Sequence, residues 1–355
     1  MSTALKEILT KRIEATGPIT LADYMADCLM HPEHGYYSQQ KIFGTDGDFI
    51  TAPEVSQMFG EMLGLWLADR WYKMDKPNQV HLIELGPGRG TLMQDILRAT
   101  EPVPEFHSAL SVHLIEASAQ LRALQAEKVP NAHWHDDLSS VPSGPSLLVA
   151  NEFFDALPIH QFEKLDGSWC ERRVNAGAEG LELVLTPAGP KFALSNKALH
   201  GGPDGSVLEI CPAGLSVAGS IGERLFADGG AALIIDYGYR KTAIGDSFQA
   251  LKNHQYVDPL ASPGEADITA HVDFEQLSNA AKGKGATSFG PAAQGAFLMA
   301  LGLGERAQQL AANLDNKGQE RVLGELTRLS SADEMGTLFK VLALQDPKLP
   351  APPGF

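Results

Sequence analysis

The chain has 355 residues, of which 44% are hydrophobic, and a formal net charge of −16 at pH 7. This length suits one large domain or two modest ones. The acidic balance argues against binding to nucleic acid or to anionic membranes, since both need a basic surface. It favours cationic substrates or partners, or simply serves solubility. No apolar run approaches the length of a membrane span, so direct membrane insertion is not expected.

The first 75 residues are predicted to form a helical cap. The apolar spacing near the N-terminus indicates an amphipathic helix, and a second helix is expected over Leu21–Met30, starting after Thr20. A glycine-rich polar loop follows. Thr51 and Glu54 then form a predicted capping box at the start of a long amphipathic helix. Because that helix should pack on the sheet, we expect the loop Gly47–Glu54 to cover a ligand.

The most distinctive stretch is Val80–Ala99, which predicts a buried strand, a tight glycine turn and a helix. Its motif is Glu84-x-Gly86-x-Gly88-x-Gly90, whereas dinucleotide enzymes carry G-x-G-x-x-G, so an NAD dehydrogenase is disfavoured. The motif resembles the first motif of class I S-adenosylmethionine (SAM) methyltransferases. An acid before the glycines suits the cationic half of SAM. The resemblance therefore implies cofactor binding by Glu84 and the three glycines.

Four further apolar strands are predicted, and each ends in polar or acidic residues. They are Ser111–Ile115 before Glu116, Ala132–His135 before Asp136 and Asp137, Ser146–Ala150 before Asn151 and Glu152, and Ala231–Ile235 before Asp236. Apolar strands that alternate with helices indicate a doubly wound, mostly parallel sheet of the α/β class. Ligands bind at the carboxyl ends of such strands.

The same resemblance suggests further cofactor contacts at these strand ends. A carboxylate at Glu116 can accept both ribose hydroxyls, although a solvated acid on a turn is the alternative. Asp137 with Leu138 falls where methyltransferases place an acid near the adenine amino group, and Asp136 competes for that role. Asn151 completes the predicted cofactor-binding set.

The stretch from Asn151 to Pro158 follows a predicted strand and carries two carboxylates, Glu152 and Asp155. In many methyltransferases this segment faces the transferred methyl group. Paired carboxylates could hold a guanidinium by a bidentate contact, which makes Glu152 and Asp155 the candidate catalytic residues. Alternatively, Asp155 only caps a helix. No metal is expected because no histidine set has ligand spacing, and no G-x-S-x-G elbow of a hydrolase occurs.

Residues 76–355 should form the methyltransferase domain with two insertions. The first, at about 159–205, begins with a predicted β-meander over Ile159–Thr186. The second, at about 295–331, reads as helical and precedes a last strand near Phe339–Leu344. The proline-rich tail Pro347–Phe355 is expected to be loosely held.

Several stretches together resemble the MidA family of SAM-dependent methyltransferases, which is related to the mitochondrial arginine methyltransferase that assists assembly of respiratory complex I. They are GPITLADYM (Gly17–Met25), HPEHGYY (His31–Tyr37), GDFITAPEVSQMFGE (Gly47–Glu61), IELGPGRGTLM (Ile83–Met93), ANEFFDALPIHQF (Ala150–Phe162) and DITAHVDF (Asp267–Phe274). The resemblance implies symmetric dimethylation of an arginine in a protein client, with a complex I subunit as one candidate. Without a mitochondrial or secretory leader, the chain is expected in the cytoplasm of a bacterial cell.

Two other classes of function stay open at this stage. The chain could be a SAM-binding assembly factor that docks a client with little catalysis, or a methyltransferase for a small molecule. Turnover of a purified protein client compared with turnover of free metabolites would distinguish them.

Overall fold

The computed structural model describes residues 3–38, 51–189 and 202–355. Its contacts divide the chain into two compact units. Unit 1 comprises Met1–Phe49, Asp155–Gly214 and Thr242–His271, and unit 2 comprises Ile50–Phe154, Leu215–Lys241 and Val272–Phe355. Both units are therefore built from segments that are far apart in the sequence.

Unit 2 contains an open sheet in the order β15-β16-β10-β5-β2-β3-β4. All pairs from β10 to β4 are parallel, whereas β16 is antiparallel to both of its neighbours. The chain order reverses at β2, since β3 and β4 lie on one side and β5 and β10 on the other. The predicted doubly wound, mostly parallel α/β fold is thus confirmed. The strands are β2 (Val80–Leu85), β3 (Leu110–Ile115), β4 (His133–His135), β5 (Ser146–Asn151), β10 (Gly230–Tyr239), β14 (Val272–Asp273, paired with β10), β15 (Thr287–Ala293) and β16 (Phe339–Gln345).

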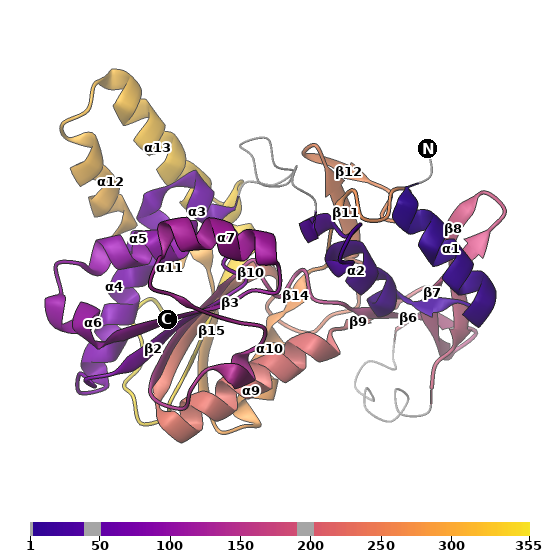
Figure 1. Ribbon diagram of the computed structural model, residues 1–355, viewed down its shortest axis with the longest axis horizontal. Helices are drawn as coiled ribbons and strands as arrows, with labels where there is room; N and C mark the ends of the chain where they lie inside the picture. The colour runs from indigo at the N-terminus through magenta and orange to yellow at the C-terminus, as the bar shows by residue number, and fades with distance from the viewer. Residues whose placement is uncertain (1–2, 39–50, 190–201) are drawn as a thin grey trace. The chain divides into compact units, whose positions relative to one another are not determined.

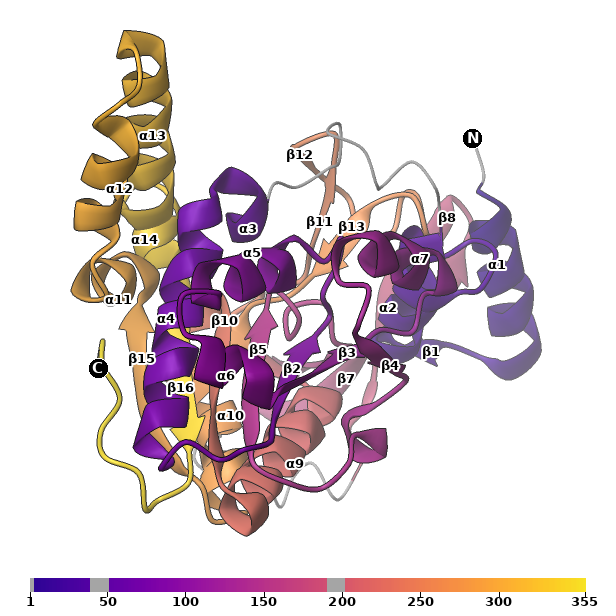
Figure 2. The same cartoon turned by 60° about the vertical axis from the view of Figure 1, so that its left-hand side comes forward.

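Helices cover both faces of this sheet, with α4 and α5 on one face and α9 and α10 on the other (Figures 1 and 2). None of the helices in the described ranges is long and apolar enough to cross a membrane. The helices are α3 (Ala52–Val55), α4 (Gln57–Lys73), α5 (Thr91–Thr100), α6 (Pro104–Ala109), α7 (Ala119–Lys128), η3 (Leu138–Ser140), α9 (Pro212–Asp228), α10 (Phe274–Lys282), α11 (Gln294–Ala300), α12 (Leu303–Ala311), α13 (Asn316–Ser330) and α14 (Met335–Leu338).

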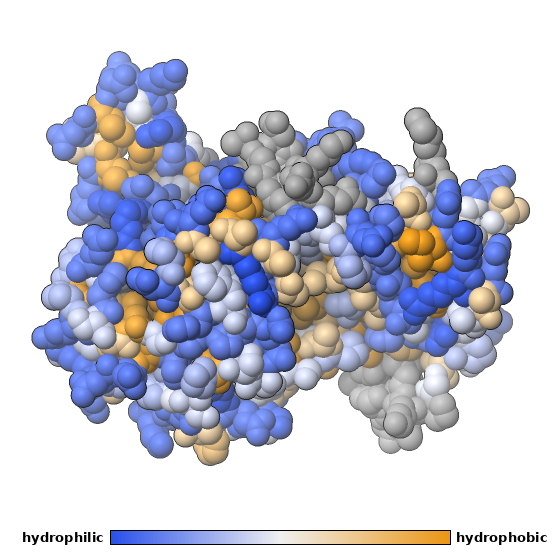
Figure 3. Space-filling model, in the orientation of Figure 1, coloured by the Kyte–Doolittle hydropathy of each residue, from blue (hydrophilic) through white to orange (hydrophobic). Residues whose placement is uncertain are grey.

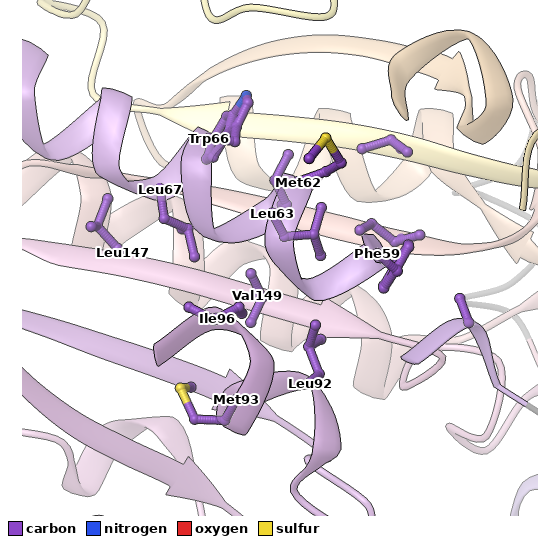
Figure 4. Packing of buried hydrophobic residues seen from close by; sticks show 14 of the residues in the cluster. Phe59, Met62, Leu63, Trp66, Leu67, Leu92, Met93, Ile96, Leu147 and Val149 are labelled. Atoms are coloured by element: carbon purple, nitrogen blue, oxygen red, sulfur yellow. The ribbon is translucent and has the colours of Figure 1, made fainter. Parts of the chain in front are cut away.

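The core of unit 2 forms where α4 and α5 pack on β5. Figure 4 shows side chains of both helices beside Leu147 and Val149 of that strand. The intervening Leu148 is also buried, because successive strand residues point to opposite faces and both faces are covered. This double burial explains why the strands read as continuous apolar runs and why their polar residues gather at the strand ends.

Unit 1 combines N-terminal helices with antiparallel strands. Its larger sheet follows the path β1-β7-β6-β9, with β8 also paired to β7, and its smaller sheet follows β12-β11-β13. The hairpins β6–β7 and β7–β8 confirm the predicted meander. The elements are α1 (Ala4–Thr16), β1 (Ile19–Thr20), α2 (Leu21–Met30), η1 (Tyr36–Ser38), β6 (His160–Leu165), β7 (Ser168–Gly177), β8 (Gly180–Pro187), β9 (Val207–Ile210), β11 (Gln249–Lys252), β12 (Gln255–Val257) and β13 (Asp267–Thr269).

The two units do not follow the domain boundary predicted at residue 75. Helix α4 belongs to unit 2, where its apolar face packs on the sheet. Helices α1 and α2 instead share a core with the meander and with residues of β11 and β13. The predicted cap is therefore divided, because its two halves bury their apolar side chains against different partners.

The predicted capping box at Thr51 and Glu54 is wrong. The Thr51 side chain makes no capping hydrogen bond, and α3 ends at Val55. The next residue, Ser56, caps α4, because its hydroxyl accepts from the Met58 N–H at 3.3 Å. The Glu54 carboxylate accepts from Thr91 Oγ1 at 2.7 Å instead, because α5 offers a tertiary partner. In the predicted covering loop Gly47–Glu54, residues 47–50 lie outside the described ranges.

The C-terminal tail is held against unit 2, so its predicted loose attachment is wrong. Trp66 Nε1 donates to the Pro353 carbonyl at 3.2 Å, and Arg70 Nη1 donates to the Pro350 carbonyl at 2.9 Å. The ring of Phe355 lies 5.3 Å from that of Phe297. Buried donors on α4 need acceptors, and the tail supplies them.

The predicted helical insertion is confirmed as α11 to α13. Arg306 of α12 pairs with the buried Glu61 of α4 at 2.7 Å, which anchors the α12–α13 hairpin. Figure 3 shows apolar surface among polar side chains on this hairpin. Leu314 and Leu323 are 37% and 61% exposed there.

Candidate active site

The glycine turn after β2 requires left-handed backbone at three positions. Gly86, Gly88 and Gly90 have φ angles of 62°, 50° and 76°. A Cβ on Gly86 would lie 2.8 Å from Phe153 Cδ2, whereas a Cβ on Gly88 would meet no atom of the described residues within 4 Å. The turn thus packs on protein at Gly86 and leaves room for a ligand at Gly88.

Glu84 lies at the end of β2 and is 2% exposed. Its Oε2 has no hydrogen-bond partner among the described residues. Burial alone raises the pKa of the Glu84 carboxyl from 4.5 to about 8. A buried polar atom without a partner is rare in folded proteins, so this carboxyl is suited to a ligand cation or donor.

Glu116 follows β3 directly and is tied to the glycine turn. Its Oε1 accepts from the Ser118 N–H at 2.8 Å, and its Oε2 accepts from Gln125 Nε2 at 3.3 Å. The same Gln125 Nε2 donates to the Gly88 carbonyl at 2.8 Å. Burial raises the pKa of Glu116 against the lowering effect of these hydrogen bonds. Sequence reasoning missed Gln125, because no pattern marks a glutamine on the apolar side of a helix.

Asp137 and Leu138 lie after β4, at the start of η3. The exposed Asp137 carboxylate caps this turn by accepting from the N–H groups of Ser139 and Ser140 at 2.9 and 3.2 Å. The Ser139 side chain, which also donates to it, contributes most to lowering the pKa of Asp137. Asp136, the competitor, pairs with Arg122. In this structure Asp137 therefore serves the local fold, and its predicted contact with adenine stays a prediction.

Asn151 and Glu152 stand at the carboxyl end of β5, next to β2 in the sheet. Glu152 has a φ of 50°, which is unusual for a residue with a side chain and points to a functional constraint. Its Oε1 accepts from the Ala52 N–H at 3.1 Å and from Asn151 Nδ2 at 3.0 Å. Asn151 Oδ1 is buried without a hydrogen-bond partner among the described residues. The helix α3 thus reaches this strand end, a link that the sequence did not reveal.

Residues inside β10, at Ile235 and Asp236, hold the turn that follows Glu152. The Glu152 N–H donates to the Ile235 carbonyl at 2.9 Å, and the Phe154 N–H donates to Asp236 Oδ2 at 3.0 Å. Asp236 itself is fully buried and lies inside β10, so the predicted strand end at Ile235 is wrong: the strand continues to Tyr239, where it pairs with β14. The position of Asp236 after an apolar run was the only sequence signal for this role.

Asp155, the second predicted catalytic carboxylate, lies in unit 1, whereas Glu152 lies in unit 2. The Asp155 residue is 7% exposed, and its carbonyl accepts from the Ala270 N–H at 3.0 Å. The described residues contain no helix between 151 and 159, so Asp155 does not cap one. Within the described ranges, no three or more His, Cys, Asp or Glu side chains are arranged to hold a metal ion.

Residues 62–292 match the model of a family described as S-adenosyl-L-methionine-dependent methyltransferase. The chain belongs to this SAM-dependent methyltransferase family. It is 38% identical to the mouse protein named "Protein arginine methyltransferase NDUFAF7, mitochondrial" over 95% of this chain and 83% of that protein. It is 37% identical to the Drosophila melanogaster homologue, over 96% of this chain and 84% of the relative.

Among solved structures, the methyltransferase chain is similar to a superfamily member from Burkholderia thailandensis that was crystallised with S-adenosyl-homocysteine (SAH). The TM-score is 0.86 at 27% identity, over 99% of this chain and 94% of the other. The cofactor of the family is SAM. The geometry fits it, because the orphaned Glu84 carboxyl, the open side of Gly88 and the Glu116 carboxylate all lie at the carboxyl ends of β2 and β3.

Proposed function

We propose that this chain transfers the methyl group of SAM to a guanidinium nitrogen of an arginine in a protein, and that a subunit of respiratory complex I is the first client to test. The observation that carries the choice of arginine is the similarity to relatives named protein arginine methyltransferase over nearly the whole chain. The net charge of −16 favours a cationic acceptor. The cytoplasmic location stays a prediction.

In this proposal the strand ends of unit 2 hold SAM. Glu84 receives the amino group, and the turn at Gly86, Gly88 and Gly90 lets backbone approach the ligand closely. Glu116 accepts the ribose hydroxyls, with Gln125 and Ser118 holding its carboxylate in place. The remaining predicted contacts are Asn151 beside the amino-acid end, and Asp137 with Leu138 beside the adenine.

Glu152 is the proposed acceptor-binding group. When bound, SAM supplies an electrophilic methyl carbon attached to a positively charged sulfur. The Glu152 carboxylate would align the guanidinium so that one nitrogen faces that carbon. As the N–C bond would form, the methyl–sulfur bond would break and leave SAH with that electron pair, and the guanidinium would give up one proton, a loss that a carboxylate contact favours. The catalytic role predicted for Asp155, which lies in unit 1, stays a prediction. The hydrogen bonds from Ala52 and Asn151 hold Glu152 Oε1, which restricts the side chain before the acceptor arrives.

The test is single-turnover methylation of an arginine-containing client by the wild type and by Glu152→Gln. The substitution keeps the shape and removes the charge, so the loss of a charge-assisted contact should slow the reaction about ten- to a hundredfold. SAH binding should change by less than about twofold, as measured by calorimetry. Glu105→Gln is the matched control, because Glu105 is an exposed acid of the same unit.

Each contrary outcome removes a defined part of the proposal. Equal rates would show that Glu152 does not handle the acceptor. Loss of SAH binding together with rate would move Glu152 into the cofactor site. Methylation of a small molecule but not of protein arginine would overturn the acceptor. Tight SAH binding without any transfer would instead support a docking factor.

A further inference from the structure

Gln125 of α7 connects residues of three neighbouring strands and their following turns in unit 2. Its side chain is fully buried. Nε2 donates to the Gly88 carbonyl at 2.8 Å and to Glu116 Oε2 at 3.3 Å, and Oε1 accepts from Trp134 Nε1 at 2.8 Å. One amide therefore links the glycine turn after β2, the carboxylate after β3 and the indole on β4.

The chemistry of the partners fixes the orientation of this amide. An indole N–H can only donate, and a carbonyl can only accept. The reversed amide would place Oε1 against the Gly88 carbonyl and Nε2 against the Trp134 N–H, so it would lose both hydrogen bonds. Gln125 accordingly presents a donor to Glu116. If the Glu116 carboxylate rotated away, this buried donor would lose one of its two acceptors, which costs free energy.

Backbone packing and a second contact fix the distance between α7 and the turn. A Cβ on Gly90 would lie 3.4 Å from Gln125 Cα, so the helix passes close to the turn. One helical turn further, Lys128 Nζ donates to Thr91 Oγ1 at 2.6 Å. Helix α7 therefore contacts the glycine segment on both sides of Gly90. These contacts fix the position of the Gln125 backbone relative to the glycine turn.

We propose that Gln125 is a positioning residue for the nucleoside half of the cofactor, because it sets the Glu116 carboxylate at a fixed distance from the glycine turn. This inference rests on the proposed role of Glu116 toward the ribose. Gln125 touches no ligand in this role. It acts through Glu116, so its removal should weaken only those contacts that depend on the ribose hydroxyls.

Calorimetry with two probes tests this inference. The probes are SAH and its 2′,3′-dideoxy analogue, titrated into the full-length wild type and into Gln125→Leu. The wild type should bind SAH more tightly than the analogue. Gln125→Leu should lose about tenfold in affinity for SAH and less than about twofold for the analogue, because the analogue has no hydroxyls for Glu116 to accept. Gln294→Leu is the matched control, since Gln294 is an equally buried glutamine of unit 2; it should leave both affinities unchanged.

A second variant keeps the test decisive if Gln125→Leu does not fold. Gln125→Glu has the same shape but places a second carboxyl beside Glu116, with Arg122 as the nearby cation. Two adjacent carboxyls share a proton more readily at low pH, which restores a donor between them. SAH should therefore bind this variant closer to the wild-type affinity at pH 6 than at pH 8, whereas the affinity for the 2′,3′-dideoxy analogue relative to the wild type should be the same at both pH values. The same pH profile for both probes would show a purely structural role and overturn the inference.

The outcomes separate this inference from the proposed function. Equal losses for both probes, or no loss for either, would overturn the role of Gln125 while the wild type still binds SAH. Equal binding of both probes by the wild type would overturn the role of Glu116, and that of Gln125 with it. No binding of SAH by the wild type would overturn the proposed function as well.

Discussion

Glu84 should make the ligand-free protein less stable as the pH rises. Its folded pKa of about 8 lies above the ordinary value of 4.5, so between these values the folded state keeps a proton that the unfolded state has lost. Stability therefore falls with rising pH across this window, by about 1.4 kcal/mol per unit and by about 5 kcal/mol in total. Below pH 4.5 the carboxyl is protonated in both states and contributes no such slope.

The variant Glu84→Gln isolates this effect, because a neutral amide does not titrate. Urea denaturation should be followed at pH 5, 6, 7 and 8 by tryptophan fluorescence, since Trp66, Trp71 and Trp134 lie in unit 2 and only Trp169 lies in unit 1. The difference in free energy of unfolding, variant minus wild type, should increase by about 2–3 kcal/mol between pH 5 and pH 7. Other buried acids contribute equally to both proteins, so the difference reports Glu84.

Binding of SAH should remove the pH-dependent loss of stability that Glu84 causes. A cation beside Glu84 favours its ionised form, so binding of SAH at pH 7 should release a proton from the wild type and none from Glu84→Gln. Calorimetry in buffers of different ionisation enthalpy measures that proton. Parallel pH profiles of stability for the two proteins, or equal proton release, would refute the reasoning.

Three other perturbations have defined outcomes. Gly88→Ala should reduce SAH affinity at least tenfold with a native circular dichroism spectrum. Gly86→Ala should lower the melting temperature more than Gly88→Ala does, because both variants carry the strain of a positive φ but only the Cβ at Gly86 would clash with Phe153; the reverse pattern would place the ligand elsewhere. Asp236→Asn should lower stability by about 1–3 kcal/mol and slow methyl transfer, because one buried N–H loses its acceptor; an unchanged single-turnover rate would show that this turn does not support Glu152. SAH at about a hundred times its dissociation constant should add about 2.7 kcal/mol to stability and NAD nothing, and a thermal shift with NAD alone would contradict the cofactor assignment.

The segments of the proposed cofactor site were the most predictable from sequence. Local physics determines them: β2 had to be apolar because both sheet faces are covered, and the turn had to carry glycine because its φ angles are positive. The strand ends at Glu116 and Asn151 followed from the same alternation. The fold class was therefore already specified in the sequence, and so was the edge of the sheet at which the site is proposed.

What the sequence could not specify depends on partners distant in the chain. Glu54 matched a helix-capping pattern, yet its carboxylate accepts a hydrogen bond from the Thr91 hydroxyl, because α5 places that hydroxyl within hydrogen-bond distance. The predicted N-terminal cap is divided between the two units. The reason is that α1 and α2 pack into one core with a meander that follows more than a hundred residues further along the chain. Gln125 looked like an ordinary helix residue, and only the packing of α7 beside the glycine turn gave its amide three partners. Local patterns record what a segment needs to bury or to bend, whereas the tertiary structure decides which side chain satisfies each buried polar group.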